Sequence, residues 1–328
     1  MAGVSTATVS YVLSGRPNGK SGVSTTTTDR VNNAAKALNY RPNVNARSTR
    51  TGRTGIVQLA LTVLDDPWVT ATAQAVTLAA RKQELTTVIL GDADWQSSLD
   101  RIECDVAFLD TVHNTTEERD RIELLVSRGQ RLVLFSDTLE PDGYDVIRSP
   151  AYPGCLLAME HLLENHERIG CLATLGSIVG APFRPTRYAA YLEALRSHGI
   201  EHNPELTVSY DGTPTGAVPA AFELLTRTPR PTAVFTNTDF AGIAVIQAAT
   251  ILGMRVPEDI AVIGAGNSPI TARTIPTLST VGPKDYFRSQ ADIIVSRAVE
   301  PEHPPHLWQF DWALHIGGST DPDAVSTR

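Results

Sequence analysis

The sequence predicts an α/β protein with two doubly wound parallel-sheet lobes, preceded by a small all-α head and a hinge. Three observations support this prediction. The chain of 328 residues is longer than a usual single domain. Its first 55 residues are basic and show helical patterning, whereas the remainder is acidic. Beyond Gly55, apolar runs rich in β-branched residues alternate with helical stretches, as in parallel sheets covered on both faces.

The composition is that of an ordinary globular protein, since 42% of the residues are hydrophobic and 20% are charged. No stretch approaches the roughly 18 uncharged apolar residues that a membrane helix requires. Residues 1–11 lack the basic and apolar regions of a signal peptide. The three cysteines, Cys104, Cys155 and Cys171, form no CxxC pair, so we interpret them as reduced thiols. We therefore expect a cytoplasmic protein.

The charge is distributed unevenly along the chain. Residues 1–55 contain eight basic residues and one acidic residue, a net charge of +7. The total is −8, so the rest of the chain carries −15. A small basic head on an acidic body indicates that the head, and not the body, meets a polyanion. The alternative is a solubilising tail, but the helical patterning of the head argues against it.

The first predicted helix of the head has an outer face suited to DNA. Ser5 can cap this helix, and Gly15 lies where it would stop. Its apolar stripe contains Val9, Val12 and Leu13, and the residues that project away from this stripe are Thr6, Ala7, Ser10 and Tyr11. Hydroxyl groups reach phosphates or base edges, and an alanine methyl group can meet a thymine methyl group. Any surface helix could share this pattern, so alone it does not establish DNA binding.

A second head helix is predicted after a loop over residues 15–22. Ser24 or Thr25 can cap it, Pro42 ends it, and its inward-facing residues are expected to be Val31, Ala35 and Leu38. We therefore place a head at residues 1–42, a hinge and linker at 43–54, and a body at 55–328.

The body alternates between predicted strands and helices. The strands are expected at 56–63, 87–90, 106–109, 132–135, 169–173, 207–210, 233–236 and 260–263, and the helices at 70–82, 117–128, 154–165, 186–198, 217–226 and 240–252. The pattern predicts two lobes, with a break near Pro150 and a chain crossing back near residue 280. Ligands in such sheets bind beyond the carboxyl ends of the strands, in the cleft between the lobes.

The head resembles a known family. The runs AGVSTATVSYVLSG (residues 2–15) and VSTTTTDRVNNAAKALNYRPNVNARSTRTGRTG (residues 23–55) resemble the helix-turn-helix head and hinge of LacI/GalR-family repressors. The resemblance implies that residues 5–13 form the recognition helix and that residues 40–48 belong to a hinge that enters the minor groove. It also implies base contacts at Thr6, Ala7 and Tyr11 and phosphate contacts at Ser5, Thr8, Ser10 and Arg47.

Two features of the head depart from the family pattern. The family's opening helix, which precedes the AGVS turn, has no counterpart here, so Val4, Val9 and Leu13 lack its packing surface. We expect the natural chain to begin upstream of Met1, or the sequence to be shortened. The second departure is Thr49, which stands where the family usually has a leucine that wedges between base steps. A threonine unstacks bases poorly, so we expect weaker operator bending than is usual in the family.

The body resembles the family's sensor core, which shares its fold with periplasmic sugar-binding proteins. The resemblance is carried by Asp66-Pro67-Trp68, by AVFTNTDFAGIAVIQAATILG and MRVPEDIAVIGAGNS (residues 233–268) and by residues 275–281. Arg187 aligns with the family's effector-contacting arginine, although a surface role is an alternative. The other expected effector-binding residues are Trp68, Asp137, Phe183, Tyr210 and Asp239. Trp68 and Phe183 could equally belong to the core, and Asp239 could instead cap its helix.

Several departures in the body concern the ligand. Thr238 replaces the family's asparagine, Gly266 replaces its aspartate, and residues 150–154 replace its usual Asp-Asn-x-x-Gly. The asparagine and the aspartate normally hold sugar hydroxyls or a purine. An unmatched polar group costs about 1–3 kcal/mol, which argues against an ordinary sugar as effector. The identity of the effector therefore stays open.

The sequence contains no catalytic signature: GxSxG, HExxH, the P-loop and GxGxxG are all absent, so we expect no enzyme activity and no cofactor. The pair His303 and His306 is only weak evidence for a metal site, because a third ligand is missing. We expect a homodimeric repressor that binds palindromic operator DNA and responds to a small-molecule effector between its lobes. The alternative is a dimeric sensor of small molecules that does not bind DNA because its head is truncated.

Overall fold

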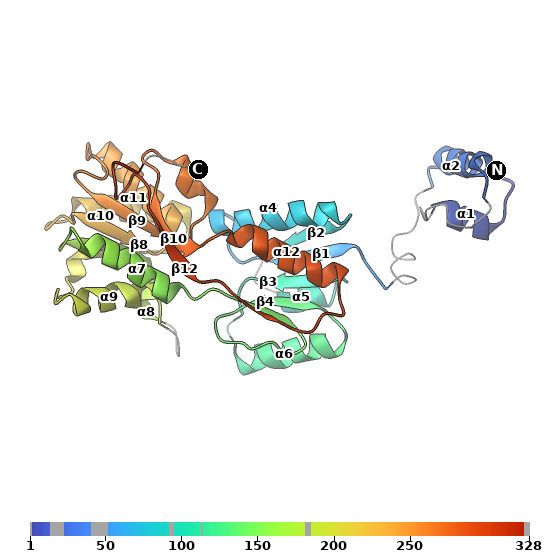
Figure 1. The fold of residues 1–328 in the computed structure, drawn as a ribbon, viewed down its shortest axis with the longest axis horizontal. Helices are drawn as coiled ribbons and strands as arrows, with labels where there is room; N and C mark the ends of the chain where they lie inside the picture. Colours follow the sequence, from blue (N-terminus) through green and yellow to red (C-terminus); the bar gives the residue numbers. More distant parts are fainter. Residues whose placement is uncertain are drawn as a thin grey trace. The chain divides into compact units, whose positions relative to one another are not determined.

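A computed structural model describes residues 2–13, 23–40, 52–91, 95–112, 114–180 and 185–324. The chain divides into two compact units, Met1–Gly55 and Ile56–Arg328 (Figure 1). The expected loop over 15–22, Pro42 and residues 43–51 of the hinge lie outside the described residues. No described helix is long and apolar enough to cross a membrane.

The first unit contains the two helices that the sequence predicts. Helix α1 spans Thr6–Leu13, and the Ser5 hydroxyl accepts a hydrogen bond from the Thr8 amide at 3.2 Å, as a capping residue does. Helix α2 spans Thr25–Ala37, and the Ser24 hydroxyl caps it in the same way through the Thr27 amide, also at 3.2 Å. Both expected helix starts are confirmed, and of the two candidates for the second cap Ser24 is the one used.

The two helices of the first unit bury few side chains. No residue of α1 is buried, and Val31 is the buried residue of α2. Leu38, which we expected to face inward, is 58% exposed, so that prediction is wrong. The physical reason is that α2 ends at Ala37, and Leu38 leaves the helical stripe as the C-cap residue. The Arg30 guanidinium donates a hydrogen bond to the Ala2 carbonyl at 2.8 Å and so holds the start of the chain against α2.

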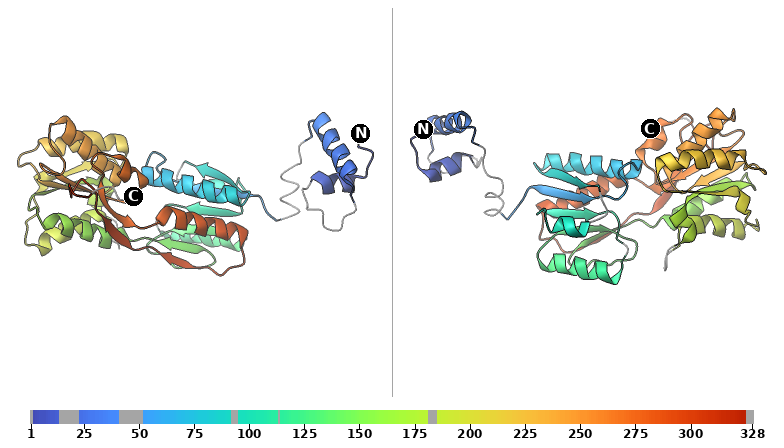
Figure 2. Two further views of the ribbon diagram at one scale, coloured as in Figure 1. Left: turned by 45° about the horizontal axis from the view of Figure 1, so that its top comes forward. Right: turned by 180° about the vertical axis from the view of Figure 1, so that it is seen from behind.

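The second unit contains two six-stranded sheets, each within its own lobe (Figure 2). The N-lobe sheet has the order β11-β5-β4-β3-β1-β2, and all its strand pairs are parallel. These strands are β1 (Ile56–Ala60), β2 (Thr86–Leu90), β3 (Val106–Leu109), β4 (Leu132–Phe135), β5 (Asp145–Arg148) and β11 (Leu307–Gln309). Its two hydrophobic clusters are formed on one face with α4 (Pro67–Lys82) and α12 (Tyr286–Val299), and on the other with α5 (Trp95–Leu99) and α6 (Thr116–Ser127).

The C-lobe sheet has the order β12-β10-β9-β8-β6-β7, and β12 is its one antiparallel strand. These strands are β6 (Ile169–Thr174), β7 (Thr207–Tyr210), β8 (Ala233–Thr236), β9 (Ala261–Ala265), β10 (Ser279–Pro283) and β12 (Trp312–His315). One face packs on α10 (Pro214–Thr226) and α11 (Asp239–Ile251), and the other on α7 (Ala151–Leu163) and α9 (Arg187–Ser197). Short helices α8 (Leu175–Val179), η1 (Pro204–Leu206) and η2 (Pro269–Arg273) complete the lobe.

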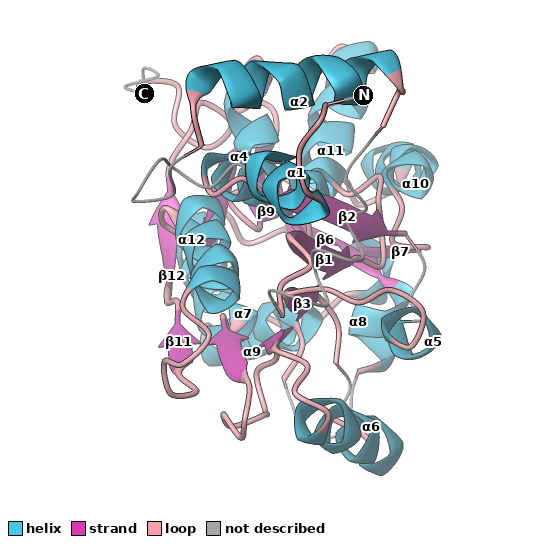
Figure 3. Cartoon of the chain, turned by 90° about the vertical axis from the view of Figure 1, so that its right-hand side faces the viewer, coloured by secondary structure: helices cyan, strands magenta, loops and turns pink. Residues whose placement is uncertain are grey.

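The predicted fold class is confirmed, because helices cover both faces of the sheet in each lobe. Figure 3 shows the helices and strands by colour, with the two lobes overlapping in this view. Four of the predicted strands, β3, β4, β7 and β8, have the expected bounds, whereas β1 ends at Ala60 and not at Val63. The chain passes between the lobes three times, through residues 149–150, 284–285 and 310–311. The strands β5, β11 and β12 and the helix α12, which border these passages, were not predicted.

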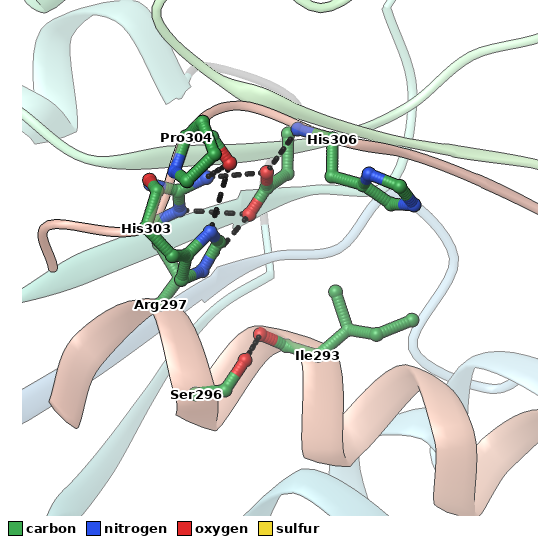
Figure 4. A network of polar contacts seen from close by, with 7 residues as sticks. Ile293, Ser296, Arg297, His303, Pro304 and His306 are labelled. Atoms are coloured by element: carbon green, nitrogen blue, oxygen red, sulfur yellow. Dashed lines mark hydrogen bonds and ion pairs between the residues drawn. The ribbon is translucent and has the colours of Figure 1, made fainter. Parts of the chain in front are cut away.

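A buried ion pair joins α12 to β5 within the N-lobe (Figure 4). Arg297 of α12 is 5% exposed and Asp145 of β5 is fully buried, and two guanidinium nitrogens of Arg297 donate to the two carboxylate oxygens. Arg297 also donates to the His303 carbonyl at 2.8 Å, and the His306 amide donates to Asp145 at 2.8 Å. The pair therefore joins α12, β5 and the loop that leads into β11.

This anchor predicts a large loss of stability when one partner is removed. Arg297→Met would leave the Asp145 carboxylate buried without its partner, and we expect the free energy of unfolding to fall by about 3–5 kcal/mol in urea denaturation. Arg255→Met, which breaks an exposed pair with Asp259, is the matched control and should change stability little. Equal losses in the two variants would contradict the anchoring role.

Candidate functional site

A cavity of about 430 Å³ lies between the two lobes, where the carboxyl ends of both sheets meet. Its N-lobe wall is formed by Asp66, Trp68, Phe135, Asp137 and Ser149. Its C-lobe wall includes Tyr152, Thr174, Ser177, Arg187, Asn237, Thr238, Asp239, Phe240, Gly266 and Ser268, and Trp312 lies at the third passage between the lobes. The cavity occupies the position that the strand order predicts for a ligand.

Arg187 is the first residue of helix α9, which is capped by the Thr186 hydroxyl, and its side chain lines the cavity. Its guanidinium donates a hydrogen bond to the Asn237 carbonyl at 2.6 Å and lies over the Trp312 ring, 5.2 Å from the ring centroid. The Trp312 indole in turn donates to the Ser149 hydroxyl at 2.9 Å. Arg187 is therefore held in place by two groups of the C-lobe, and Ser149 on the opposite wall holds the Trp312 ring.

Asp239 forms the floor of the cavity. Its carboxylate accepts hydrogen bonds from the Ser268 amide and hydroxyl, each at 2.7 Å, and from the Thr280 hydroxyl. Burial raises the pKa of Asp239, and these hydrogen bonds and the charge of Arg187 act in the opposite direction. Helix α11 is capped by the Thr238 hydroxyl, so Asp239 serves to join α11 to β9 and β10 and does not cap its helix.

Asp66 and Trp68 begin helix α4 on the opposite wall. The Asp66 carboxylate caps the helix by accepting a hydrogen bond from the Trp68 amide at 2.8 Å. Burial raises the pKa of Asp66 above its usual range. The Trp68 ring lies 5.3 to 5.7 Å from the rings of Phe135, Tyr286 and Phe287, measured between centroids. These neighbours fix its orientation toward the cavity.

The structure brings together four of the expected effector-binding residues, namely Trp68, Asp137, Arg187 and Asp239. Phe183 lies outside the described residues. Tyr210 is buried and does not line the cavity; its hydroxyl donates to the Asn237 side chain at 3.0 Å and lies 2.8 Å from the Thr238 hydroxyl. Its place is therefore behind the wall, where it orients two residues that do line the cavity.

Sequence reasoning missed several lining residues. Asn237 lies within the run 233–253 that carries the resemblance, and its place directly after β8 was the signal that could have revealed it. Ser149 borders the passage that was expected near Pro150, although it was not recognised as a lining residue, and Trp312 begins β12, which was not predicted. Asp66 was noted only as part of a motif, although its position before α4 places it at a strand end.

In the first unit, Ser5, Thr6, Ala7 and Ser10 are exposed, whereas Thr8 and Tyr11 are half-buried. The exposed residues of α1 therefore include three of the four that were expected to project from the apolar stripe. Arg47 and Thr49 lie outside the described residues. The contacts of all these residues with DNA stay a prediction.

Comparisons with known proteins support both units. Residues 1–43 match the model of "Bacterial regulatory proteins, lacI family", and residues 159–320 match "Periplasmic binding protein-like domain". The HTH-type transcriptional repressor PurR of Yersinia pestis bv. Antiqua is 30% identical over 324 residues, covering 92% of this chain and 90% of that protein.

Solved structures show the same fold over most of the chain. A complex of the transcriptional regulator CelR with cellobiose has a TM-score of 0.63 and 25% identity, and covers 97% of each chain. A LacI family transcriptional regulator from Enterococcus faecium with bound ribose has a TM-score of 0.66 and 20% identity, over 81% of this chain and 99% of the other.

A helical DNA-binding unit together with a two-lobed binding body defines a transcriptional repressor that is controlled by a small-molecule effector. The chain belongs to the lacI family of bacterial regulatory proteins. The predicted family is thereby confirmed, and with it operator DNA and a small molecule as binding partners.

Gly266 is expected to tolerate no side chain. Its φ is +137°, and a Cβ atom there would lie 3.1 Å from Asp239 Oδ2 and 3.7 Å from Trp68 Cδ1. We expect Gly266→Asp to lower the free energy of unfolding by about 1–3 kcal/mol, because it adds backbone strain and a second carboxylate beside Asp239. Thermal unfolding measures this loss. Gly253→Asp, at a positive φ in open space, is the control and should lose less; wild-type stability of Gly266→Asp would contradict the crowding.

Proposed function

We propose that the cavity between the lobes is the effector site and that its occupancy sets the affinity of the head for operator DNA. The observation that carries this proposal is the two-sided wall: Asp66 and Trp68 from one lobe face Arg187 and Asp239 from the other. A ligand that contacts both walls favours one relative orientation of the lobes over another. A differential affinity of this kind provides the coupling between the two sites, which is typically worth about 1–3 kcal/mol.

We assign DNA reading to the head at residues 1–42, followed by a hinge at 43–54 and the sensing body at 55–328. In the head, base contacts are assigned to Thr6, Ala7 and Tyr11, and phosphate contacts to Ser5, Thr8, Ser10 and Arg47, with Thr49 at the minor groove. One recognition helix reads half of a site, so a homodimer with twofold symmetry reads a palindrome. The protein acts by binding, without catalysis, and in the cytoplasm, where it meets the chromosome.

Arg187 provides a test of the effector site. Arg187→Ala removes the guanidinium from the cavity wall, so we expect loss of the effector response and unchanged operator affinity in fluorescence anisotropy titrations. Arg196→Ala is the matched control, because Arg196 lies on the same helix but is exposed and paired with Glu193. A full response in Arg187→Ala would rule out the assigned site.

The outer face of α1 provides a test of DNA reading. We expect Thr6→Ala and Tyr11→Ala to weaken binding to the operator by about 1–3 kcal/mol each and to leave binding to unrelated duplexes nearly unchanged. Gel-shift titration of the full-length protein against its own promoter measures both affinities. Asn33→Ala, on the exposed surface of α2, is the control. Equal weakening on operator and unrelated DNA would show that these residues do not read bases.

A further inference from the structure

We infer that the effector carries a positively charged nitrogen and is an organic ammonium compound held by carboxylates and aromatic rings. This inference rests on the proposed function, because it assigns a ligand class to the same cavity. It follows from the charge of the two walls, from the groups that are already engaged, and from the rings that line the cavity.

The described lining residues carry more negative than positive charge. Asp66, Asp137 and Asp239 contribute three carboxylates, and Arg187 is the single cation among them. Asp66 and Asp137 both belong to the N-lobe wall, where no described lysine or arginine lines the cavity. An anionic ligand would therefore meet two carboxylates on that wall, which is unfavourable in a partly desolvated site.

The C-lobe wall is largely satisfied by its own contacts. Arg187 donates to the Asn237 carbonyl, lies over Trp312, and acts through its charge on Asp239 and Asp66. The Asp239 carboxylate already accepts three hydrogen bonds. The opposite charges of Arg187 and Asp239 offset each other, so the net negative charge of the cavity resides on the N-lobe wall.

The aromatic lining suits a cation. Five rings border the cavity, those of Trp68, Phe135, Tyr152, Phe240 and Trp312. The face of an aromatic ring attracts an ammonium group within about 6 Å of its centroid, and tryptophan is the best such ring. Rings can also stack on a sugar or a base, so they do not select a cation alone. Trp68 and Phe135 lie on the same wall as Asp66 and Asp137, and this combination of rings and carboxylates favours an ammonium group over a hydroxyl group.

The two positions that depart from the family pattern agree with this ligand class. Gly266 offers no side-chain acceptor, and the Thr238 hydroxyl is engaged in capping α11 and lies 2.8 Å from the Tyr210 hydroxyl. Little side-chain capacity for ligand hydroxyls therefore remains at these two positions. A cavity of 430 Å³ falls within the size range of sites for small molecules.

Replacing Asp66 should raise the stability of the ligand-free protein and lower its affinity for the ligand, and both effects can be measured. Burial raises the pKa of Asp66, and the charges of Asp239 and Asp65 act in the same direction, against that of Arg187. A carboxyl group with a raised pKa in the folded state destabilises the fold once the pH exceeds its unfolded pKa. Asp66→Asn, in which asparagine still caps α4, should therefore raise the melting temperature of the ligand-free protein at neutral pH, with no difference at pH values below that pKa.

The same substitution should weaken the binding of an ammonium ligand. We expect titration calorimetry of the full-length protein at constant ionic strength to show binding of glucosamine, ethanolamine or choline in preference to glucose, ethylene glycol or malonate. Asp66→Asn should reduce the affinity for the bound ammonium compound about 10- to 100-fold. Asp65→Asn makes the same charge change one residue away, at an exposed position outside the lining, and should leave the affinity unchanged.

The pH dependence gives a second measurement. Affinity for the ammonium compound should increase as the pH rises through the titration of Asp66, since the protonated carboxyl does not attract a cation. A preference for glucose or malonate over the ammonium compounds, or no preference at all, would overturn the inference. If Arg187→Ala abolishes the binding of the preferred glucose or malonate, the proposed effector site stands and only the ligand class fails; if it leaves that binding intact, the site fails as well.

Discussion

The buried Asp239 carboxylate is the interaction on which the cavity depends. It begins α11 and accepts hydrogen bonds from Ser268, which follows β9, and from Thr280 in β10, so one group holds three segments of the C-lobe at their strand ends. The chain leaves room for this carboxylate. A Cβ atom at position 264 would lie 2.7 Å from Asp239 Oδ1, and one at position 266 would lie 3.1 Å from Oδ2. A side chain at either position would crowd this carboxylate.

This arrangement gives the two walls different roles. The C-lobe wall is pre-organised by its own hydrogen bonds. Tyr210 donates to the Asn237 side chain and lies beside the Thr238 hydroxyl, and Arg187 donates to the Asn237 carbonyl. The N-lobe wall supplies rings and carboxylates at the ends of β1 and β4, and Trp68 reaches toward the space above Gly266. The N-lobe wall therefore contributes most of the net negative charge of the cavity.

The sequence predicted best those elements whose signal is local. Strands such as Val106–Leu109 and Thr207–Tyr210 are short apolar or β-branched runs bounded by turns, and their expected bounds are confirmed. The contact between Arg187 and Trp312 joins residues far apart in the chain, and Trp312 lies on an antiparallel edge strand with no strong pattern. Asn237 follows β8 directly, but its hydrogen bonds with Tyr210 and Thr174 join residues that are far apart in the sequence and could not be predicted from it.

The three passages between the lobes are each two residues long, at 149–150, 284–285 and 310–311. Connections this short leave little slack, so sliding of one lobe along the other is disfavoured and rotation about an axis through the connections is the available motion. The Asp145–Arg297 ion pair holds α12, β5 and the loop before β11 together within the N-lobe. Rotation of a lobe about this axis displaces the far end of the lobe more than the residues beside the cavity.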